Sequence, residues 1–127
     1  MEFSKPKKIF IVDDDAMLRE ALSDYLTRTV PHQITCFNTG EDCLKHIGEN
    51  PDIIILDYYL NTVKKDAANG MEILQAIKKT SRNIHVIMLS SQERYVIAMQ
   101  TIQKGAEQYV IKDDFAFENI AKIVAKM

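Results

Sequence analysis

Asp52-Ile53-Ile54-Ile55-Leu56-Asp57-Tyr58-Tyr59 is the stretch that decides the fold of this chain. Its four consecutive large apolar residues, 53–56, predict a short strand buried on both faces, as the central strands of parallel sheets are. Asp57 ends that strand, and open α/β sheets bind their ligands at the carboxyl ends of strands. The stretch therefore predicts a functional carboxylate on a central strand, although an isolated Asp after an apolar run more often only turns the chain into solvent.

Four other segments have the pattern of strands, and the segments between them have the period of helices. Together with 53–56, the predicted strands are residues 7–12, 32–37, 83–89 and 108–111. The predicted helices are 16–30, 41–47, 71–77, 92–104 and 117–127, and Arg19 lies on the polar face of the first one. Strands that alternate with helices form a parallel sheet through right-handed crossovers, so the predicted fold class is doubly wound α/β.

The composition narrows the classes of function. With 127 residues, 46% of them apolar, the chain has the size and core of one domain, 1–127. Its 16 basic and 18 acidic residues leave a net charge of -2, so charge alone predicts neither a nucleic-acid nor a membrane surface. No apolar run approaches the roughly 20 residues of a membrane helix and no signal peptide is recognised, so we expect a soluble, cytoplasmic protein.

Polar residues follow four of the five predicted strands. Asp13 and Asp14 follow the first, Asp57 the third, Ser90 the fourth and Lys112 the last. Because the carboxyl ends of parallel strands share one edge, these side chains are expected to converge. Two carboxylates about 4 Å apart repel by up to about 4 kcal/mol at an effective dielectric near 20, so three of them need a cation or a raised pKa. Oxygen ligands favour Mg²⁺, which in turn implies a phosphoryl group, whereas no glycine-rich turn for a dinucleotide is present.

These residues closely resemble the receiver domain of bacterial two-component response regulators, such as the single-domain chemotaxis regulator. The motifs that carry the resemblance are Val12-Asp13-Asp14, Ile55-Leu56-Asp57, the Val-Ile-Met-Leu-Ser-Ser of residues 86–91 and the Gly-Ala-Glu-Gln-Tyr-Val-Ile-Lys of residues 105–112. The resemblance covers nearly the whole chain. It implies a five-stranded parallel sheet with the flavodoxin-like strand order 2-1-3-4-5.

The resemblance also implies a chemistry for the acidic residues. Asp57 would accept a phosphoryl group from a phosphohistidine of a sensor histidine kinase or a phosphotransfer protein. Mg²⁺ would be held by Asp14, Asp57 and the backbone carbonyl of Tyr59, with Asp13 acting through water. The domain would transfer a phosphoryl group to itself and lose it slowly, without turning over an external substrate.

A switch is implied as well. Ser90 matches the hydroxyl residue that hydrogen-bonds the phosphoryl oxygen, Tyr109 matches the aromatic reporter, and Lys112 matches the phosphate-binding lysine. The fourth helix, last strand and last helix are expected to form the surface for a downstream protein or effector domain, and a dimer through the same surface is the alternative. No direct nucleic-acid partner and no membrane are expected.

Each of these residues also has a purely structural explanation. Asp14 or Asp15 alone would cap the first helix, and Ser90 with Glu93 fits the capping box of the fourth. Lys112 alone would be a solvated surface lysine. Five suitable residue types at the predicted strand ends together favour the functional interpretation.

The chain departs from the family pattern near the predicted site. Asn61 stands where the family usually has Pro, Gly70 comes about five residues late, and Asp113 replaces the Pro that normally follows the lysine. The segment 61–70 is therefore an enlarged loop, which either folds over the rim of the site and controls access or is a disordered loop. Asp113 removes the usual cis-proline and adds a carboxylate next to Lys112 in the sequence.

Two other functions compete with the phosphorylation switch. A phosphatase of the haloacid-dehalogenase type would explain the acidic opening Asp13-Asp14-Asp15 and the pair Leu89-Ser90, but it leaves Asp57 unexplained. Turnover of a simple phosphate ester separates that enzyme from a switch. A receiver-like interaction module that is never phosphorylated would fit the altered loop, and the complete set of five site residues opposes it.

Overall fold

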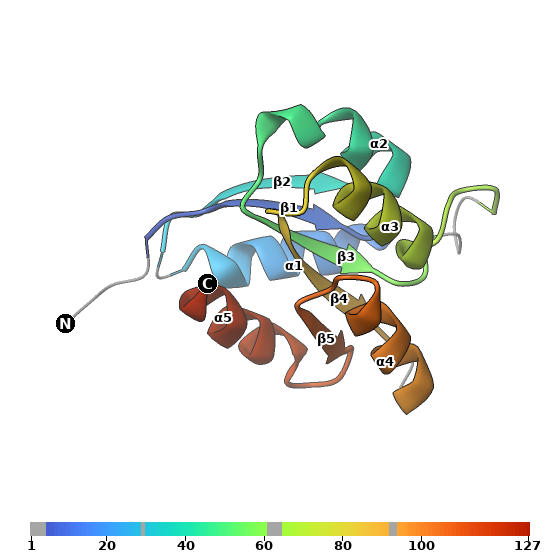
Figure 1. Ribbon diagram of the computed structural model, residues 1–127. Helices are drawn as coiled ribbons and strands as arrows, with labels where there is room; N and C mark the ends of the chain where they lie inside the picture. The colour runs from blue at the N-terminus through green and yellow to red at the C-terminus, as the bar shows by residue number, and fades with distance from the viewer. Residues whose placement is uncertain (1–4, 29, 61–64, 92–93) are drawn as a thin grey trace.

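The computed structural model describes residues 5–28, 30–60, 65–91 and 94–127 (Figure 1). Its elements are β1 (Lys8–Val12), α1 (Ala16–Leu26), β2 (Gln33–Phe37), α2 (Gly40–Lys45), β3 (Ile53–Asp57), α3 (Gly70–Thr80), β4 (His85–Ser90), α4 (Tyr95–Gln103), β5 (Gln108–Ile111) and α5 (Ala116–Lys126). A short 3-10 helix, Ile47–Glu49, separates α2 from β3. In the described part of the chain, no helix is long and apolar enough to span a membrane.

The five strands form one parallel sheet in the order β2-β1-β3-β4-β5. The register places Ile54 of β3 beside Phe10 of β1 on one side and beside Val86 of β4 on the other. The predicted fold class and strand order are thus confirmed. All strands run in the same direction, so their carboxyl ends lie along one edge of the sheet.

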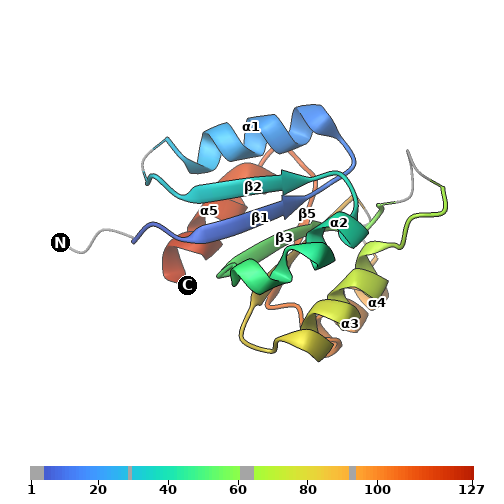
Figure 2. The same cartoon turned by 90° about the horizontal axis from the view of Figure 1, so that it is seen from above.

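The central strand supplies both halves of the core, because alternate side chains of a strand point to opposite faces. Ile54 and Leu56 belong to the cluster under α2 and α3, whereas Ile53 and Ile55 belong to the cluster under α1 and α5. Figures 1 and 2 show these helix pairs on opposite faces of the sheet, with α4 beside α3. Burying each such side chain stabilises the fold by about 1.5–3 kcal/mol, which holds the end of β3 rigidly in place.

The helix termini decide between the structural explanations considered above. Asp15 is the N-cap of α1, since its Oδ1 accepts hydrogen bonds from the backbone N–H groups of Met17 and Leu18 at 3.0 and 3.3 Å. Asp14 is therefore not the cap. The N-cap of α4 is Arg94, without a side-chain hydrogen bond, so the suggestion that Ser90 caps this helix is wrong. Ser90 instead belongs to β4, and Glu93 lies outside the described residues.

The boundaries of several elements differ slightly from those predicted. The strand predicted at 83–89 spans His85–Ser90, because the backbone of Ser90 still pairs with Ile111 in β5. The helix predicted at 92–104 is described from Tyr95 to Gln103, and residues 92–93 lie outside the described part. Ser90 is therefore the last residue of β4 and not part of the loop before α4.

The end of the enlarged loop after β3 is hydrogen-bonded to the residue that directly follows the strand. The backbone N–H of Gly70 donates to the carbonyl oxygen of Tyr58 at 2.8 Å. A Cβ atom at Gly70 would meet the Asp57 carbonyl oxygen and lie 2.7 Å from the Tyr58 Cα atom, so only glycine fits this approach. Two residues before Gly70, the backbone N–H of Ala68 donates to Glu41 Oε2 at 2.9 Å. The base of the loop and its last residues are thus held against β3 and α2, while 61–64 lie outside the described residues.

Candidate functional site

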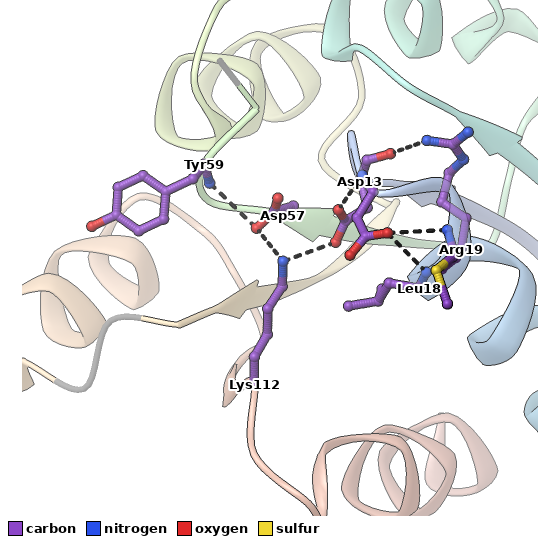
Figure 3. A network of polar contacts seen from close by, with 8 residues as sticks. Asp13, Leu18, Arg19, Asp57, Tyr59 and Lys112 are labelled. Atoms are coloured by element: carbon purple, nitrogen blue, oxygen red, sulfur yellow. Dashed lines mark hydrogen bonds and ion pairs between the residues drawn. The ribbon is translucent and has the colours of Figure 1, made fainter. Parts of the chain in front are cut away.

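The carboxyl ends of four strands bring the predicted polar side chains to one edge of the sheet, and Figure 3 shows Asp13, Asp57 and Lys112 there. Asp57 ends β3, Ser90 ends β4, Asp13 directly follows β1 and Lys112 directly follows β5. The side chains of Asp13 and Asp57 are 1% and 2% exposed. Two carboxylates are therefore nearly removed from water at the same edge, which is costly unless they are paired with a cation or protonated.

Lys112 bridges the two buried carboxylates. Its Nζ atom lies 3.1 Å from Asp13 Oδ2 and 3.2 Å from Asp57 Oδ1. The backbone N–H of Lys112 donates to the Ser90 carbonyl oxygen at 2.8 Å, which extends the pairing of β5 with β4 by one residue. This bond fixes the start of the lysine side chain, so the ammonium group is aimed between the carboxylates.

The carboxylate of Asp113 is directed elsewhere. Asp113 Oδ1 accepts a hydrogen bond from the Phe115 backbone N–H at 2.9 Å, just before α5. The peptide bond between Lys112 and Asp113 is trans. Asp113, which replaces the usual Pro, therefore organises the turn into α5.

A group of carboxylates suitable for a divalent cation lies beside this lysine. One oxygen each of Asp13, Asp14 and Asp57 lies within 4.8 Å of the others. Asp13 Oδ2 is buried and makes no well-aligned hydrogen bond to the described residues, although the Lys112 ammonium group lies 3.1 Å away as an ion pair. An all-oxygen donor set with a buried oxygen that lacks a hydrogen bond fits a hard cation such as Mg²⁺.

The electrostatics of the pocket favour protons when no divalent cation is bound. Burial, and secondarily the nearby charge of Asp13, raise the pKa of Asp57 to about 7, although Lys112 and the Tyr59 N–H act in the opposite direction. Burial also raises the pKa of Asp13. Burial tends to lower the pKa of Lys112, but the charges of Asp57 and Asp13 outweigh it, so the net pKa is raised and the lysine stays charged.

Tyr59 reaches the site through its backbone. Its N–H donates to Asp57 Oδ1 at 3.3 Å, while its ring points away from the carboxylates (Figure 3). The ring packs edge-on against Tyr58 with centroids 4.9 Å apart. The role of the Tyr59 carbonyl as a cation ligand stays a prediction.

Ser90 at the end of β4 and Tyr109 in the neighbouring strand β5 contact each other. Ser90 is fully buried, and its side chain is hydrogen-bonded to that of Tyr109. The Tyr109 ring is half-buried and packs against the core cluster under α2 and α3. Burial raises the pKa of its hydroxyl, so Tyr109 is neutral at physiological pH. A change at Ser90 therefore has a direct physical route to Tyr109.

Arg19 is a site residue that our sequence analysis placed only on the polar face of α1. Its Nη1 atom donates to the backbone carbonyl oxygen of Asp13 at 2.6 Å (Figure 3). The sequence holds only a weak signal for this contact, since a cation in the first turn of a helix is slightly disfavoured by the positive end of the helix dipole.

The comparisons with known proteins all point to one family. Residues 9–125 match the model described as the response regulator receiver domain. A probable C4-dicarboxylate response regulator, DctR of Bacillus subtilis (strain 168), is 33% identical over 96% of this chain and 52% of its own length. The chemotaxis protein CheY of Thermotoga maritima is 25% identical over 84% of this chain and 85% of its own.

Solved structures have the same architecture. The BeF3-activated receiver domain of DrrB superposes with a TM-score of 0.82 at 29% identity, covering 95% of this chain and 96% of that one. The signal receiver domain of a putative Luxo repressor protein from Vibrio parahaemolyticus gives 0.81 at 25% identity, covering 95% and 91%. The chain spans only about half the length of DctR, at 52%. These similarities therefore concern the receiver part of such proteins.

Proposed function

This chain belongs to the response regulator receiver domain family, and on that basis we propose that it is a phosphorylation switch whose acceptor is Asp57. The phosphodonor is a phosphohistidine of a sensor histidine kinase or of a phosphotransfer protein. The observation that carries the proposal is the burial of Asp57 between a lysine and two further aspartates at the end of the central strand. We further propose that residues 1–127 form one receiver domain acting in the cytoplasm.

The transfer is a displacement at phosphorus. A carboxylate oxygen of Asp57 forms the new bond to phosphorus, the bond to the imidazole nitrogen breaks, and the imidazole leaves with the electron pair. Both described contacts of the Asp57 carboxylate, from Lys112 and from the Tyr59 N–H, fall on Oδ1. We therefore assign the attack to Oδ2. Lys112 stays beside the reacting group and neutralises charge that develops on the phosphoryl oxygens.

The acidic group fits Mg²⁺, which supplies charge neutralisation of the phosphoryl oxygens when it is bound. Asp14, Asp57 and the Tyr59 carbonyl are proposed to hold it, with Asp13 acting through water. The raised pKa of Asp57 supports this role for a cation. Near neutral pH a large share of the carboxyl groups carries a proton, and a protonated carboxyl group is a poor nucleophile.

Ser90 and Tyr109 are proposed to transmit the modification. The Ser90 hydroxyl would turn from Tyr109 to a phosphoryl oxygen, which changes the environment of the Tyr109 ring. A hydrogen bond to a charged group contributes about 1.5–3 kcal/mol, whereas moving an equilibrium from 1:99 to 99:1 takes about 5.5 kcal/mol. Ser90 alone is therefore insufficient, and we propose that Lys112 and a bound partner complete the shift.

The partner surface is proposed to lie on α4, β5 and α5. Large apolar side chains are exposed there, including Tyr95 at 75% and Phe115 at 63%. Isolated exposed apolar residues are ordinary, but several on adjacent elements mark an interaction surface. A downstream protein or an effector domain is the proposed partner, and a second copy of the chain is the alternative. No direct contact with nucleic acid is proposed for this domain.

Asp57→Asn tests the proposal directly. The variant and the wild-type chain are treated with acetyl phosphate and Mg²⁺, and the covalent modification is measured by intact-mass spectrometry. We expect modification of the wild type and none of Asp57→Asn, while the control Asp24→Asn, at an exposed position in α1, behaves as wild type. Equal modification of Asp57→Asn and wild type would refute the assignment.

A second assay separates the switch from the phosphatase considered above. Hydrolysis of p-nitrophenyl phosphate is followed over many equivalents of substrate. A switch consumes none beyond its own slow turnover, whereas sustained hydrolysis that survives Asp57→Asn would favour an enzyme that uses the β1 aspartates.

A further inference from the structure

Arg19 makes an unusual contact for a residue on the outside of α1. Its guanidinium group reaches back from the first turn of the helix and donates to the Asp13 carbonyl oxygen at 2.6 Å (Figure 3). That distance is slightly shorter than the range of about 2.7–3.2 Å usual for N–H···O bonds, and charged donors make the shorter bonds. Among the described residues, Arg19 takes part in no ion pair. Its main polar partner is thus a backbone carbonyl at the edge of the candidate site.

The carbonyl needs this donor because of where β2 ends. The Asp13 N–H donates to the Phe37 carbonyl oxygen at 3.1 Å, which continues the parallel pairing of β1 with β2. In a regular parallel ladder the Asp13 carbonyl would next accept from the N–H of Thr39. However, β2 ends at Phe37 and Thr39 is the N-cap of α2. No backbone N–H of the described residues donates to the Asp13 carbonyl, so Arg19 takes the place of the missing strand residue.

The segment that Arg19 holds carries the three aspartates between β1 and α1. Asp13 Oδ1 accepts the Asp15 N–H at 2.9 Å, and Asp15 in turn caps α1. The position of the Asp13 carbonyl therefore helps to set the direction in which the Asp13 and Asp14 side chains leave the turn. Those two side chains supply two of the three oxygens that lie within 4.8 Å of one another.

A simple charge role for Arg19 predicts the opposite effect on cation binding. A positive group close to the pocket repels Mg²⁺, so removing it would strengthen binding. A positioning role predicts that removing it weakens binding, because the oxygens lose their arrangement.

We infer that Arg19 is a positioning residue, which completes the end of β1 and keeps Asp13 and Asp14 directed at the cation. This inference rests on the proposed function. It names a determinant of cation affinity that touches neither the cation nor the phosphoryl group. By analogy with other residues that orient metal ligands, its loss is expected to weaken Mg²⁺ affinity by about tenfold.

The test is an isothermal titration of the unphosphorylated chain with MgCl₂, using wild type, Arg19→Met and Arg19→Lys. Arg28→Met is the matched control, since Arg28 follows α1 at its other end and lies over the Tyr25 ring, 5.3 Å from the centroid. We expect about tenfold weaker binding for Arg19→Met. Arg19→Lys should bind between the two, because an ammonium group can still donate to the carbonyl. The control should bind as wild type.

Unfolding by urea and the amide NMR signals of Asp14 and Asp15 without Mg²⁺ are measured on the same variants. The inference requires these two signals to shift in Arg19→Met even where the protein is fully folded. Arg19→Met that binds Mg²⁺ as well as or better than wild type would overturn it, whether or not the variant is destabilised. Wild type that binds no Mg²⁺ would overturn the cation part of the proposed function, and the inference with it, so the two failures are distinguishable.

Discussion

The two ends of β3 carry the same residue type in contrasting surroundings. Asp52 precedes the strand, is exposed, and accepts the Lys8 backbone N–H through Oδ2 at 2.8 Å. Asp57 ends the strand, is 2% exposed, and faces Lys112 and two other aspartates. Only the four apolar residues 53–56 separate them. The comparison teaches that burial and convergence of charges distinguish the carboxyl edge of the sheet, where we propose the reactive Asp, whereas the Asp at the other edge accepts a backbone hydrogen bond that joins two strands.

The two ends of β3 should differ most in the effect of removing the neighbouring lysine side chain. Lys112→Met removes the charge that faces Asp57 and Asp13, and we expect labelling by acetyl phosphate to slow by about 100-fold, as loss of one transition-state contact does elsewhere. Lys8→Met is the matched control, because Asp52 contacts the backbone and not the side chain of Lys8. Rates come from intact-mass time courses. Equal slowing of both variants would mean that the two ends are not distinct.

Removal of the buried charge should stabilise the metal-free protein. The pKa of Asp57 is about 7 in the folded chain against 3.8 as its ordinary value. Between these values the folded state keeps a proton that the unfolded state has lost, so the unfolding free energy falls as pH rises from about 4 to 7. Below that window the group contributes nothing, and above it the destabilisation is complete.

Asp57→Asn should therefore raise the unfolding free energy at pH 7.5 in EDTA, by up to about 4 kcal/mol if the whole shift is removed, with no gain near pH 4. Urea denaturation at both pH values measures it. Asp52→Asn should be neutral or destabilising at pH 7.5, because its carboxylate accepts a backbone hydrogen bond. A stabilisation of Asp57→Asn that is independent of pH would contradict the electrostatic explanation.

The hydroxyl beside Asp57 should affect the output and not the modification. Ser90→Ala is expected to leave labelling of Asp57 intact but to remove the change that phosphorylation causes in the NMR signals of Tyr109. Ser81→Ala, at the C-cap of α3 before β4 begins, serves as the control and should respond as wild type. If phosphorylated Ser90→Ala shows the same Tyr109 shift as phosphorylated wild type, the coupling through Ser90 should be abandoned.

The smallest effect is expected from the enlarged loop on the Asp57 side of β3. Residues 61–64 lie outside the described part, and the last residues of the loop are held through Ala68 to Glu41 and through Gly70 to the Tyr58 carbonyl. Control of access to the site by the segment 61–70 stays a hypothesis. Shortening the segment by five residues, with Gly70 kept, should change labelling and dephosphorylation rates by a few-fold. Unchanged rates in both assays would rule out control of access and leave an ordinary surface loop.

Much of this protein could be predicted from local patterns. The apolar run of β3 and the alternation of strands with helices determined a parallel sheet, because burial on both faces and right-handed crossovers leave few alternatives. The same patterns placed Asp13, Asp57, Ser90 and Lys112 at strand ends. Because all strands of a parallel sheet run in the same direction, these ends lie at one edge.

Only the tertiary structure decided which contacts the individual side chains at this edge make. Asp14 and Asp15 are adjacent and identical, yet the entry angle of α1 directs one to the pocket and the other to the helix N-terminus. Arg19 contacts the Asp13 carbonyl because β2 ends before it can pair there. Ser90 lies in the sheet because β5 pairs with it. Helix angle, strand length and register arise from packing between segments distant in the chain, so no local pattern contains them.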